Sequence, residues 1–180
     1  MNTIQTGFDG LVIIKPKIYC DERGLFYESW RENQYKEMGI QESFLQDNIS
    51  VSKKNVLRGL HYQKNQGQLV TVLQGSIFDV VVDLRPYSTT FQKYFSLVLA
   101  SDLPRQLYMP PGFAHGFYVL SDEVIMNYKC TQYYNAAHES GVVWNDPDLN
   151  IQWPCKNPIV SEKDSTFLPV MRAKNYEFFR

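Results

Sequence analysis

The sequence predicts an all-β protein, an antiparallel sandwich or jelly roll, and three features of the chain favour that fold class. Short runs of β-branched and aromatic residues recur, no helical pattern separates them, and turn-forming residues mark their ends. Strands spaced this regularly are typical of antiparallel sandwiches and jelly rolls. The runs that we predict to be strands are Leu69–Leu73, Ile77–Leu84, Tyr94–Leu99, Gln106–Met109, Gly116–Leu120 and Val124–Cys130.

Turn-forming residues lie between these runs. Each boundary contains glycine, proline or aspartate, which favour the backbone conformations of tight turns. The boundaries are Gln74-Gly75, Arg85-Pro86, Ser101-Asp102, Pro110–Gly112 and Ser121-Asp122.

One short helix is predicted between Trp30 and Met38. Ser29 precedes this segment and is suited to cap it, Glu32 lies three residues later as a capping-box partner, and Gly39 is suited to end it. We expect this helix to cover one end of the barrel, and the pattern leaves a second helix near the C-terminus open.

Length and charge limit the classes of function. The chain has 180 residues, 44% of them hydrophobic, and no linker or repeat, which predicts a single domain over residues 1–180. The 18 basic and 19 acidic residues give a net charge of −1. This balance predicts neither nucleic-acid binding nor membrane-surface binding, although a local basic pocket for a phosphate stays possible.

The cysteines and the N-terminus indicate the compartment. Cys20, Cys130 and Cys155 are odd in number and lack metal-ligand spacing, so we interpret them as reduced thiols. The first residues contain no basic stretch followed by an apolar run, and no apolar segment is long enough to span a bilayer. We therefore expect a cytoplasmic protein with no signal peptide.

Two of the three histidines have unusual neighbours. His61 lies in the run 57–63 and His115 in the run 110–117, and a glycine is close to each. Histidine is the side chain best suited to take a proton near neutral pH, and glycine allows a close backbone approach. A structural histidine that is satisfied by hydrogen bonds remains the alternative for each.

A metal site is the next possibility for these histidines. The segment 110–115 resembles the second half of a cupin metal motif, whose first half offers two histidines one residue apart and then a glutamate. In this chain His61 stands alone before Tyr62 and Gln63, and His138 lies in a polar, turn-like stretch. Because the ligands are too few, we expect no tightly bound metal.

Carboxylates and tyrosines complete the candidates. Asp83 and Asp164 are close in sequence to Arg85 and Lys163, so a surface or ion-paired position is the default for both acids. Tyr128 falls in a predicted strand, where packing alone would explain a tyrosine.

Taken in order, these segments resemble the dTDP-4-dehydrorhamnose 3,5-epimerase family, also called the dTDP-6-deoxy-D-xylo-4-hexulose 3,5-epimerases. The similarity runs through nearly the whole chain. The segments that carry it are Asp21–Gly24, Phe26, Glu28, Gln46–Asn48, Ser50, Leu57–Gln63, Phe78–Val80, Val82–Arg85, Ser88–Phe91, Arg105–Leu107, Pro111–Phe117, Tyr128–Lys129, Trp144–Pro147, Ile151–Pro154 and Ser161–Asp164.

The resemblance implies a cupin-like jelly-roll barrel with a few short helices, which works as a homodimer without a cofactor. The implied substrate is a 4-keto-6-deoxyhexose attached to a nucleoside diphosphate, with thymidine as the expected base. A proton leaves a carbon beside the ketone and returns on the opposite face. The ketone permits this because the carbanion delocalises into an enolate.

The resemblance also assigns residues by position. His61 matches the family's base, Asp164 the carboxylate that pairs with it, and Tyr128 the tyrosine that returns the proton. A carboxylate orients the imidazole and stabilises its protonated form. Arg23 and Arg58 match residues near the diphosphate, where a guanidinium fits phosphate oxygens. Further implied contacts to the sugar and nucleoside are Phe26, Glu28, Gln46 and Asn48, with His115 as a supporting residue of the site lining.

The chain departs from the family pattern at one position of the site. Family members usually have Gln-Gly-Lys-Leu-Val where this chain has Gln66–Val70, so Gln68 replaces a lysine, and the loop before it looks shorter. A neutral donor holds developing charge on the ketone oxygen less strongly than a charged one. Our leading prediction is epimerisation at both C3 and C5. The alternatives are epimerisation at C3 alone, or at another nucleoside-diphosphate 4-keto sugar.

Three other classes of protein are alternatives to the epimerase. One is a metal-dependent cupin enzyme, in which His61 and His115 would converge on a metal with further ligands. A second is a non-catalytic sugar-binding jelly roll, and a third is a 3,4-ketoisomerase of the same architecture. Tyr128 in the acid position favours epimerisation over ketoisomerisation.

Overall fold

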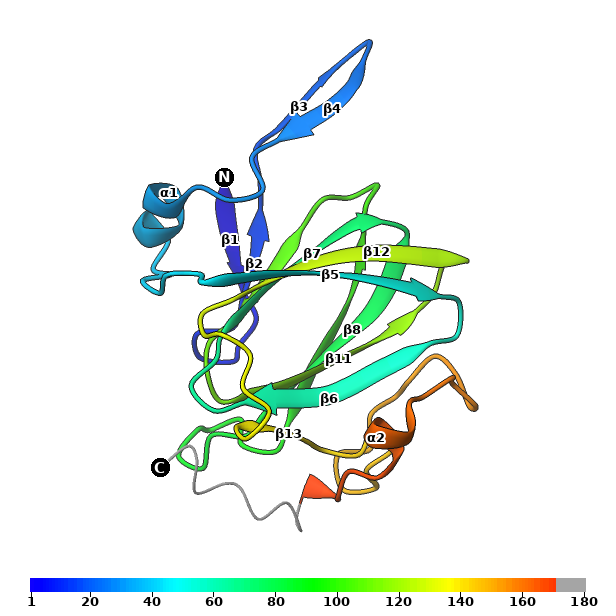
Figure 1. Cartoon of the computed structure of the whole chain (residues 1–180). Helices are drawn as coiled ribbons and strands as arrows, with labels where there is room; N and C mark the ends of the chain where they lie inside the picture. The colour runs from blue at the N-terminus through cyan, green and yellow to red at the C-terminus, as the bar shows by residue number, and fades with distance from the viewer. Residues whose placement is uncertain (171–180) are drawn as a thin grey trace.

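The computed structural model describes residues 1–170, in which two antiparallel sheets face each other (Figure 1). The six-stranded sheet has the order β1 (Asn2–Gln5), β2 (Val12–Lys15), β10 (Gln106–Met109), β7 (Gln68–Gln74), β12 (Glu123–Cys130) and β5 (Gln46–Lys53). The five-stranded sheet has the order β13 (Glu139–Gly141), β6 (Leu57–Gln63), β11 (Phe113–Val119), β8 (Ser76–Asp83) and β9 (Tyr94–Ala100).

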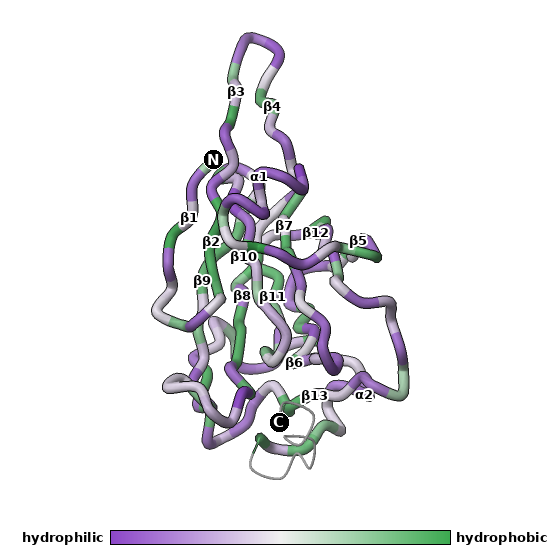
Figure 2. The backbone as a smooth tube through the Cα atoms, turned by 90° about the vertical axis from the view of Figure 1, so that its left-hand side faces the viewer, coloured by the Kyte–Doolittle hydropathy of each residue, from purple (hydrophilic) through white to green (hydrophobic). Residues whose placement is uncertain are grey.

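The remaining elements lie outside the two sheets. A separate hairpin of β3 (Ile18–Asp21) and β4 (Gly24–Tyr27) projects away from the body of the molecule in both views (Figures 1 and 2). Two short helices are α1 (Glu32–Glu37) and α2 (Glu162–Ser165). The predicted all-β jelly roll is confirmed, but the hydrogen-bonded strands of residues 1–170 do not close into one ring. The architecture is a two-sheet jelly roll rather than a closed barrel.

Alternation along the strands decides which side chains face the interior. In β7, Val70 and Val72 join the cluster between the sheets, whereas Leu69 packs on the outer face. In β8, Val81 points inward, whereas Val80 and Val82 pack on the outside beneath the C-terminal loops. This period of two follows from the pleat of a strand. Hydrophobic colouring accordingly follows central strands such as β2 and β8 (Figure 2).

The predicted strands are confirmed apart from their ends. The strand predicted over 116–120 begins at Phe113, because its histidine and glycine weaken the pattern of a buried strand. The segments that become β1–β5 and β13 were not predicted as strands, and neither was the segment that becomes β6. It contains arginine, glycine, histidine and glutamine, which are poor β-formers, and the cavity between the sheets accounts for their presence.

The predicted helix is present, but its cap is different. Arg31 is the N-cap of α1 and makes no side-chain capping bond, while Glu32 pairs with Lys36 at 2.8 Å. Gly39 follows the helix with φ of +96°, as expected of a residue that ends one. The prediction that Ser29 caps the helix is therefore wrong. The helix also covers the outer face of the six-stranded sheet, where Tyr35 is buried, rather than an end of the sandwich.

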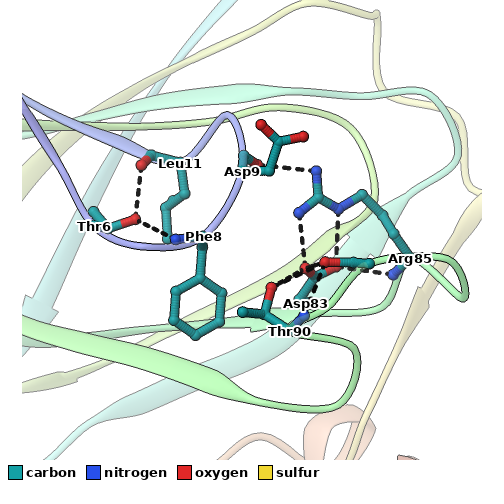
Figure 3. Close-up of polar contacts among 8 residues, drawn as sticks. Thr6, Phe8, Asp9, Leu11, Asp83, Arg85 and Thr90 are labelled. Carbon is teal, nitrogen blue, oxygen red and sulfur yellow. Dashed lines mark hydrogen bonds and ion pairs between the residues drawn. The ribbon is translucent and has the colours of Figure 1, made fainter.

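A buried polar cluster fixes one end of the sandwich (Figure 3). Asp83 is fully buried and accepts hydrogen bonds from Arg85 Nη2 at 2.7 Å, Ser88 Oγ at 2.6 Å and Thr90 Oγ1 at 2.7 Å. Arg85 also donates to the carbonyl of Asp9 at 3.0 Å, which ties in the N-terminal loop. Burial alone would raise the pKa of Asp83, but these hydrogen bonds outweigh it and lower that pKa. The expected ion-paired position of Asp83 is confirmed.

Candidate active site

A cavity of about 590 Å³ lies between the inner faces of the two sheets. Its walls come from β5, β7 and β12 on one side and from β6 and β11 on the other. It brings together most of the residues that the sequence suggested, although they are spread over 83 positions of the chain between Gln46 and Tyr128. The predicted residues that line it are Gln46, Asn48, Arg58, His61, Gln68, His115 and Tyr128.

His61 enters this cavity on β6 with a carboxylate behind its ring. His61 Nε2 lies 2.7 Å from Asp164 Oδ1, and the Asp164 side chain is only 5% exposed. The second oxygen of Asp164 accepts from the backbone N–H of Gly59 at 3.1 Å, so both carboxylate oxygens are satisfied. The N-cap Ser161 holds the Asp164 backbone by accepting from its N–H at 3.1 Å. The carboxylate that orients His61 is therefore itself held on two sides.

The charge of Asp164 decides what His61 is able to do. Burial alone would raise the pKa of Asp164, but the hydrogen bond from His61 and those from Gly59 and the Ser161 segment lower it overall. An ionised carboxylate accepts hydrogen bonds and donates none, so His61 donates from Nε2. The neutral ring then keeps Nδ1 as an acceptor, and His61 is 34% exposed to the cavity side. This arrangement suits a general base.

Tyr128 approaches the cavity from the opposite sheet. It lies on β12, which belongs to the six-stranded sheet, whereas His61 lies on β6 in the five-stranded sheet. The ring packs against the cluster between the sheets, and its burial raises the pKa of the phenol. The hydroxyl therefore stays protonated at neutral pH and is a proton donor.

Polar side chains of β5 and β6 form the wall next to this pair. Arg58 Nε donates to Ser52 Oγ at 2.9 Å, which holds the guanidinium against β5. Gln46 Nε2 donates to Asn48 Oδ1 at 2.9 Å, and Gln46 Oε1 accepts from the backbone of Tyr134 at 2.8 Å. These side chains supply a cation and amide groups of fixed orientation.

Gln68 lies on β7 and lines the same cavity. Its amide Nε2 donates to Gln66 Oε1 at 3.2 Å. Among the described residues that line the cavity, Arg58 is the only one with a permanent positive charge. No lysine lies in the described lining beside Gln68, the residue that the resemblance places at the family's lysine position.

His115 forms a second imidazole–carboxylate pair beside the first. It is the cross-strand partner of His61, and its Nε2 lies 2.9 Å from Asp79 Oδ2. Asp79 is fully buried, and its Oδ1 has no hydrogen-bond partner in residues 1–170. The His115 side chain is 9% exposed, so it is a far less accessible group than His61.

Sequence reasoning missed a cluster at the cavity mouth. Glu139 Oε2 accepts from Lys163 Nζ at 2.6 Å and from the Tyr134 hydroxyl at 2.8 Å, and both Tyr134 and Glu139 line the cavity. Burial would raise the pKa of Glu139, but the bonds from Lys163 and Tyr134 lower it. Nothing in a polar, turn-like stretch marks these residues, because their meeting depends on the path of the loops.

Three predicted substrate contacts lie away from this cavity. Arg23, Phe26 and Glu28 belong to the projecting hairpin and its base. The Arg23 side chain is 86% exposed and pairs with Asp21, Phe26 is 65% exposed, and Glu28 pairs with Arg31 at 3.4 Å. Within one chain, the structure does not bring these three residues to His61.

The described residues contain neither a metal-ligand cluster nor a helix that could span a membrane. Within residues 1–170, no group of three or more histidine, cysteine, aspartate or glutamate residues is placed to hold a metal ion. Cys20, Cys130 and Cys155 are free thiols. In the same part of the chain, no helix has the length and apolar character that a membrane span requires.

Comparison with known proteins gives consistent matches. The family model described as dTDP-4-dehydrorhamnose 3,5-epimerase matches residues 5–171. The dTDP-4-dehydrorhamnose 3,5-epimerase of Methanothermobacter thermautotrophicus is 48% identical over 178 residues, which is 96% of each chain. The Escherichia coli enzyme of the same name is 44% identical over 169 residues, 91% of each chain.

Solved structures give the same result. The dTDP-6-deoxy-D-glucose-3,5-epimerase of Legionella pneumophila, in complex with dTDP-4-keto-L-rhamnose, has a TM-score of 0.93 and 47% identity, covering 98% of this chain and 96% of its own. The 3'-monoepimerase ChmJ of Streptomyces bikiniensis, in complex with dTDP-quinovose, has a TM-score of 0.89 and 28% identity, covering 96% and 89%.

Proposed function

Because this chain belongs to the dTDP-4-dehydrorhamnose 3,5-epimerase family, we propose that His61, Asp164 and Tyr128 epimerise C3 and C5 of a dTDP-4-keto-6-deoxyhexose. The observation that carries this proposal is the position of the two proton-transfer groups. His61 and Tyr128 line one cavity from opposite sheets. An epimerase needs this arrangement, since the proton must leave one face of the sugar and return on the other.

His61 performs the first half of the reaction. Its Nδ1 takes the proton from a carbon beside the C4 ketone, and the electron pair of the C–H bond delocalises into an enolate. The ring becomes an imidazolium, which the ionised Asp164 stabilises at 2.7 Å. Both C3 and C5 flank the ketone, so the same base serves both carbons in turn.

Tyr128 performs the second half. Its buried, protonated hydroxyl gives a proton to the carbanion carbon from the face opposite His61, and the ketone re-forms. Water restores both groups through proton exchange before the next cycle. The proposed reaction consumes no cofactor, because the proton lost and the proton gained balance.

The remaining cavity residues bind and polarise the substrate. Arg58 is the cation available in this lining for the diphosphate, and Gln46, Asn48 and His115 are contacts to the sugar and nucleoside. Gln68 donates a neutral hydrogen bond toward the ketone oxygen. This neutral group supports one second candidate, in which the weaker polarisation limits the reaction to C3.

The hairpin residues fit the proposal if two copies associate. An isolated two-stranded hairpin with exposed Tyr19, Leu25 and Phe26 gains little stability from its own contacts. Packing it against the cavity of a second copy would bury these side chains and bring Arg23 toward the substrate. We therefore expect a homodimer, which sedimentation equilibrium would detect as twice the 21.0 kDa chain mass.

We also propose a cytoplasmic enzyme that works without a metal. The three free cysteines favour a cytoplasmic location. A metal-dependent reaction would require further ligands beside His61 and His115, and within residues 1–170 no group of three or more histidine, cysteine, aspartate or glutamate residues is placed to supply them. Treatment of the purified enzyme with a chelator should therefore leave its activity unchanged.

Proton NMR in heavy water tests the proposed reaction. The enzyme is incubated with dTDP-4-keto-6-deoxyglucose, and the C3 and C5 hydrogens are followed separately. Loss of both signals together with the inverted product supports the 3,5-epimerase, whereas loss at C3 alone supports the second candidate. No exchange at either carbon would reject this substrate.

A further inference from the structure

A hydrogen-bond cluster that is buried except at Ser29 lies outside the cavity, at the base of the hairpin. Its members are Ser29, Tyr35, Thr71 and Gln106, and we call it the hairpin clamp. Gln106 Nε2 donates to the carbonyl of Ser29 at 2.7 Å and to Thr71 Oγ1 at 2.9 Å. Gln106 Oε1 accepts from the Tyr35 hydroxyl. The whole amide of this buried glutamine is therefore used to join separate segments.

One end of the clamp fixes the chain where it leaves the hairpin. Ser29 follows the end of β4 by two residues, and its carbonyl lies within hydrogen-bond distance of Tyr35 Oη at 3.0 Å as well as Gln106 Nε2. The ring of Trp30 packs on Tyr35 with 4.4 Å between ring centroids. Hydrogen bonds are directional, so these contacts set the direction in which the hairpin projects.

The other end of the clamp reaches the strands that form the cavity. Thr71 belongs to β7 and pairs in register with Asn127 of β12, the residue before Tyr128. Gln106 pairs in register with Thr71, so the clamp lies across β10 and β7 on the outer face of the six-stranded sheet. The hairpin is thus fixed to β7, one of the strands whose inner faces line the cavity.

From this geometry we infer that the hairpin clamp is a positioning element for nucleotide binding, in which Tyr35 and Gln106 hold the hairpin so that Phe26 and Arg23 reach the cavity of a second copy. The inference rests on the proposed function of the hairpin. The clamp residues touch no substrate. They act through the hairpin, so their loss should weaken substrate binding and leave the proton transfers intact.

A comparison of KM and kcat between the variants Tyr35→Phe and Tyr108→Phe separates this positioning role from a merely structural one. Tyr108 lies in the same apolar cluster as Tyr35, but its hydroxyl neighbours Glu42 rather than the clamp. Both variants lose one buried hydroxyl, but Tyr35→Phe should lower the thermal midpoint more, because Tyr108 Oη has no hydrogen-bond partner in residues 1–170. Tyr35→Phe should raise KM about three- to tenfold, as loss of one hydrogen bond allows, with kcat within about twofold of wild type. Tyr108→Phe should leave KM unchanged.

A double-mutant cycle with Phe26→Ala shows whether Tyr35 acts through the hairpin. Phe26→Ala should raise KM about tenfold, as truncation of an aromatic contact does. In that background Tyr35→Phe should add less than about twofold, because coupled residues are not additive. Gln106→Met should give the same pattern as Tyr35→Phe.

Each contrary result has a separate meaning. Equal KM values for Tyr35→Phe and Tyr108→Phe, or full additivity with Phe26→Ala, would overturn the positioning role while the proposed function stands. An unchanged KM in Phe26→Ala would instead overturn the proposed role of the hairpin, and the clamp inference with it.

Discussion

The two imidazole–carboxylate pairs of the cavity are neighbours, yet they differ in access and in hydrogen bonding. His61 is 34% exposed, and its partner Asp164 has both oxygens bonded. His115 is 9% exposed, and its partner Asp79 leaves one buried oxygen without a hydrogen-bond partner in the described chain. The same pair of residue types thus serves two purposes. The greater exposure of His61 favours it as the proposed base, and the burial of His115 favours a place in the wall of the cavity.

The largest expected effect is that of His61→Asn. Asparagine keeps much of the volume and polarity, but it cannot take the proton. We expect kcat to fall about a thousandfold, the usual size of a general-base contribution. Steady-state assays coupled to reduction of the product would measure it. A fall of less than about tenfold would mean that another group is the base.

Asp164→Asn should have the next largest effect. The amide cannot stabilise the imidazolium, and its NH₂ group favours the His61 tautomer whose Nδ1 is already protonated. We expect kcat to fall about a hundredfold, while KM changes little because Asp164 does not line the cavity. The matched control is Asp79→Asn, and an equal loss of kcat in both variants would remove the distinction between the two pairs.

His115→Asn should have a smaller effect than either. Its side chain lines the cavity, but it is nearly buried and is not placed as the base. We expect kcat/KM to fall about tenfold, comparable to the loss of one hydrogen bond to the substrate. Heavy-water exchange at C3 should continue in this variant. Loss of all exchange would show that His115 takes part in proton removal.

The smallest effect concerns acid stability. The pKa of folded Asp164 is lowered below its ordinary value of 3.8, so its ionised form stabilises the fold. This stabilisation is complete above pH 3.8 and is lost as the pH falls through the lower, folded pKa. The free energy of unfolding of wild type should therefore exceed that of Asp164→Asn by about 1–2 kcal/mol at pH 7, which is the size expected for a charged hydrogen bond. When urea unfolding is measured at several pH values, the difference in the free energy of unfolding between wild type and Asp164→Asn should shrink below pH 3.8. A difference that stays constant with pH would contradict a stabilising role of the ionised Asp164.

The strands that the sequence predicted are those with apolar, β-branched cores, such as β7, β8 and β12. The prediction missed seven strands, β1–β6 and β13. Among them, β6 breaks the apolar pattern because its polar residues line a cavity, and β2 is only four residues long. The prediction also misplaced the helix cap, because the carbonyl of Ser29 is bound by Gln106, a contact 77 residues away in sequence. Local rules cannot anticipate a partner that only the tertiary fold supplies.

The pairing of His61 with Asp164 shows the same limit of local sequence rules. His61 and Asp164 are 103 residues apart, so only resemblance to a family linked them before the structure was known. The inward direction of Tyr128 follows from strand alternation once the register of β12 is known. The contacts of Glu139 with Tyr134 and Lys163 had no local signal, since they join the start of β13 to the loop before it and to α2.

Tyr128→Phe in heavy water tests most directly whether protons leave and return on opposite faces. The variant keeps His61 and Asp164, so C3 deuterium exchange should continue, with His61 returning the label to the face it came from. Inverted product should fall about a hundredfold or more, the size of a general-acid contribution. Exchange without inversion would support a base and an acid on opposite sheets. Inversion at the wild-type rate would contradict it.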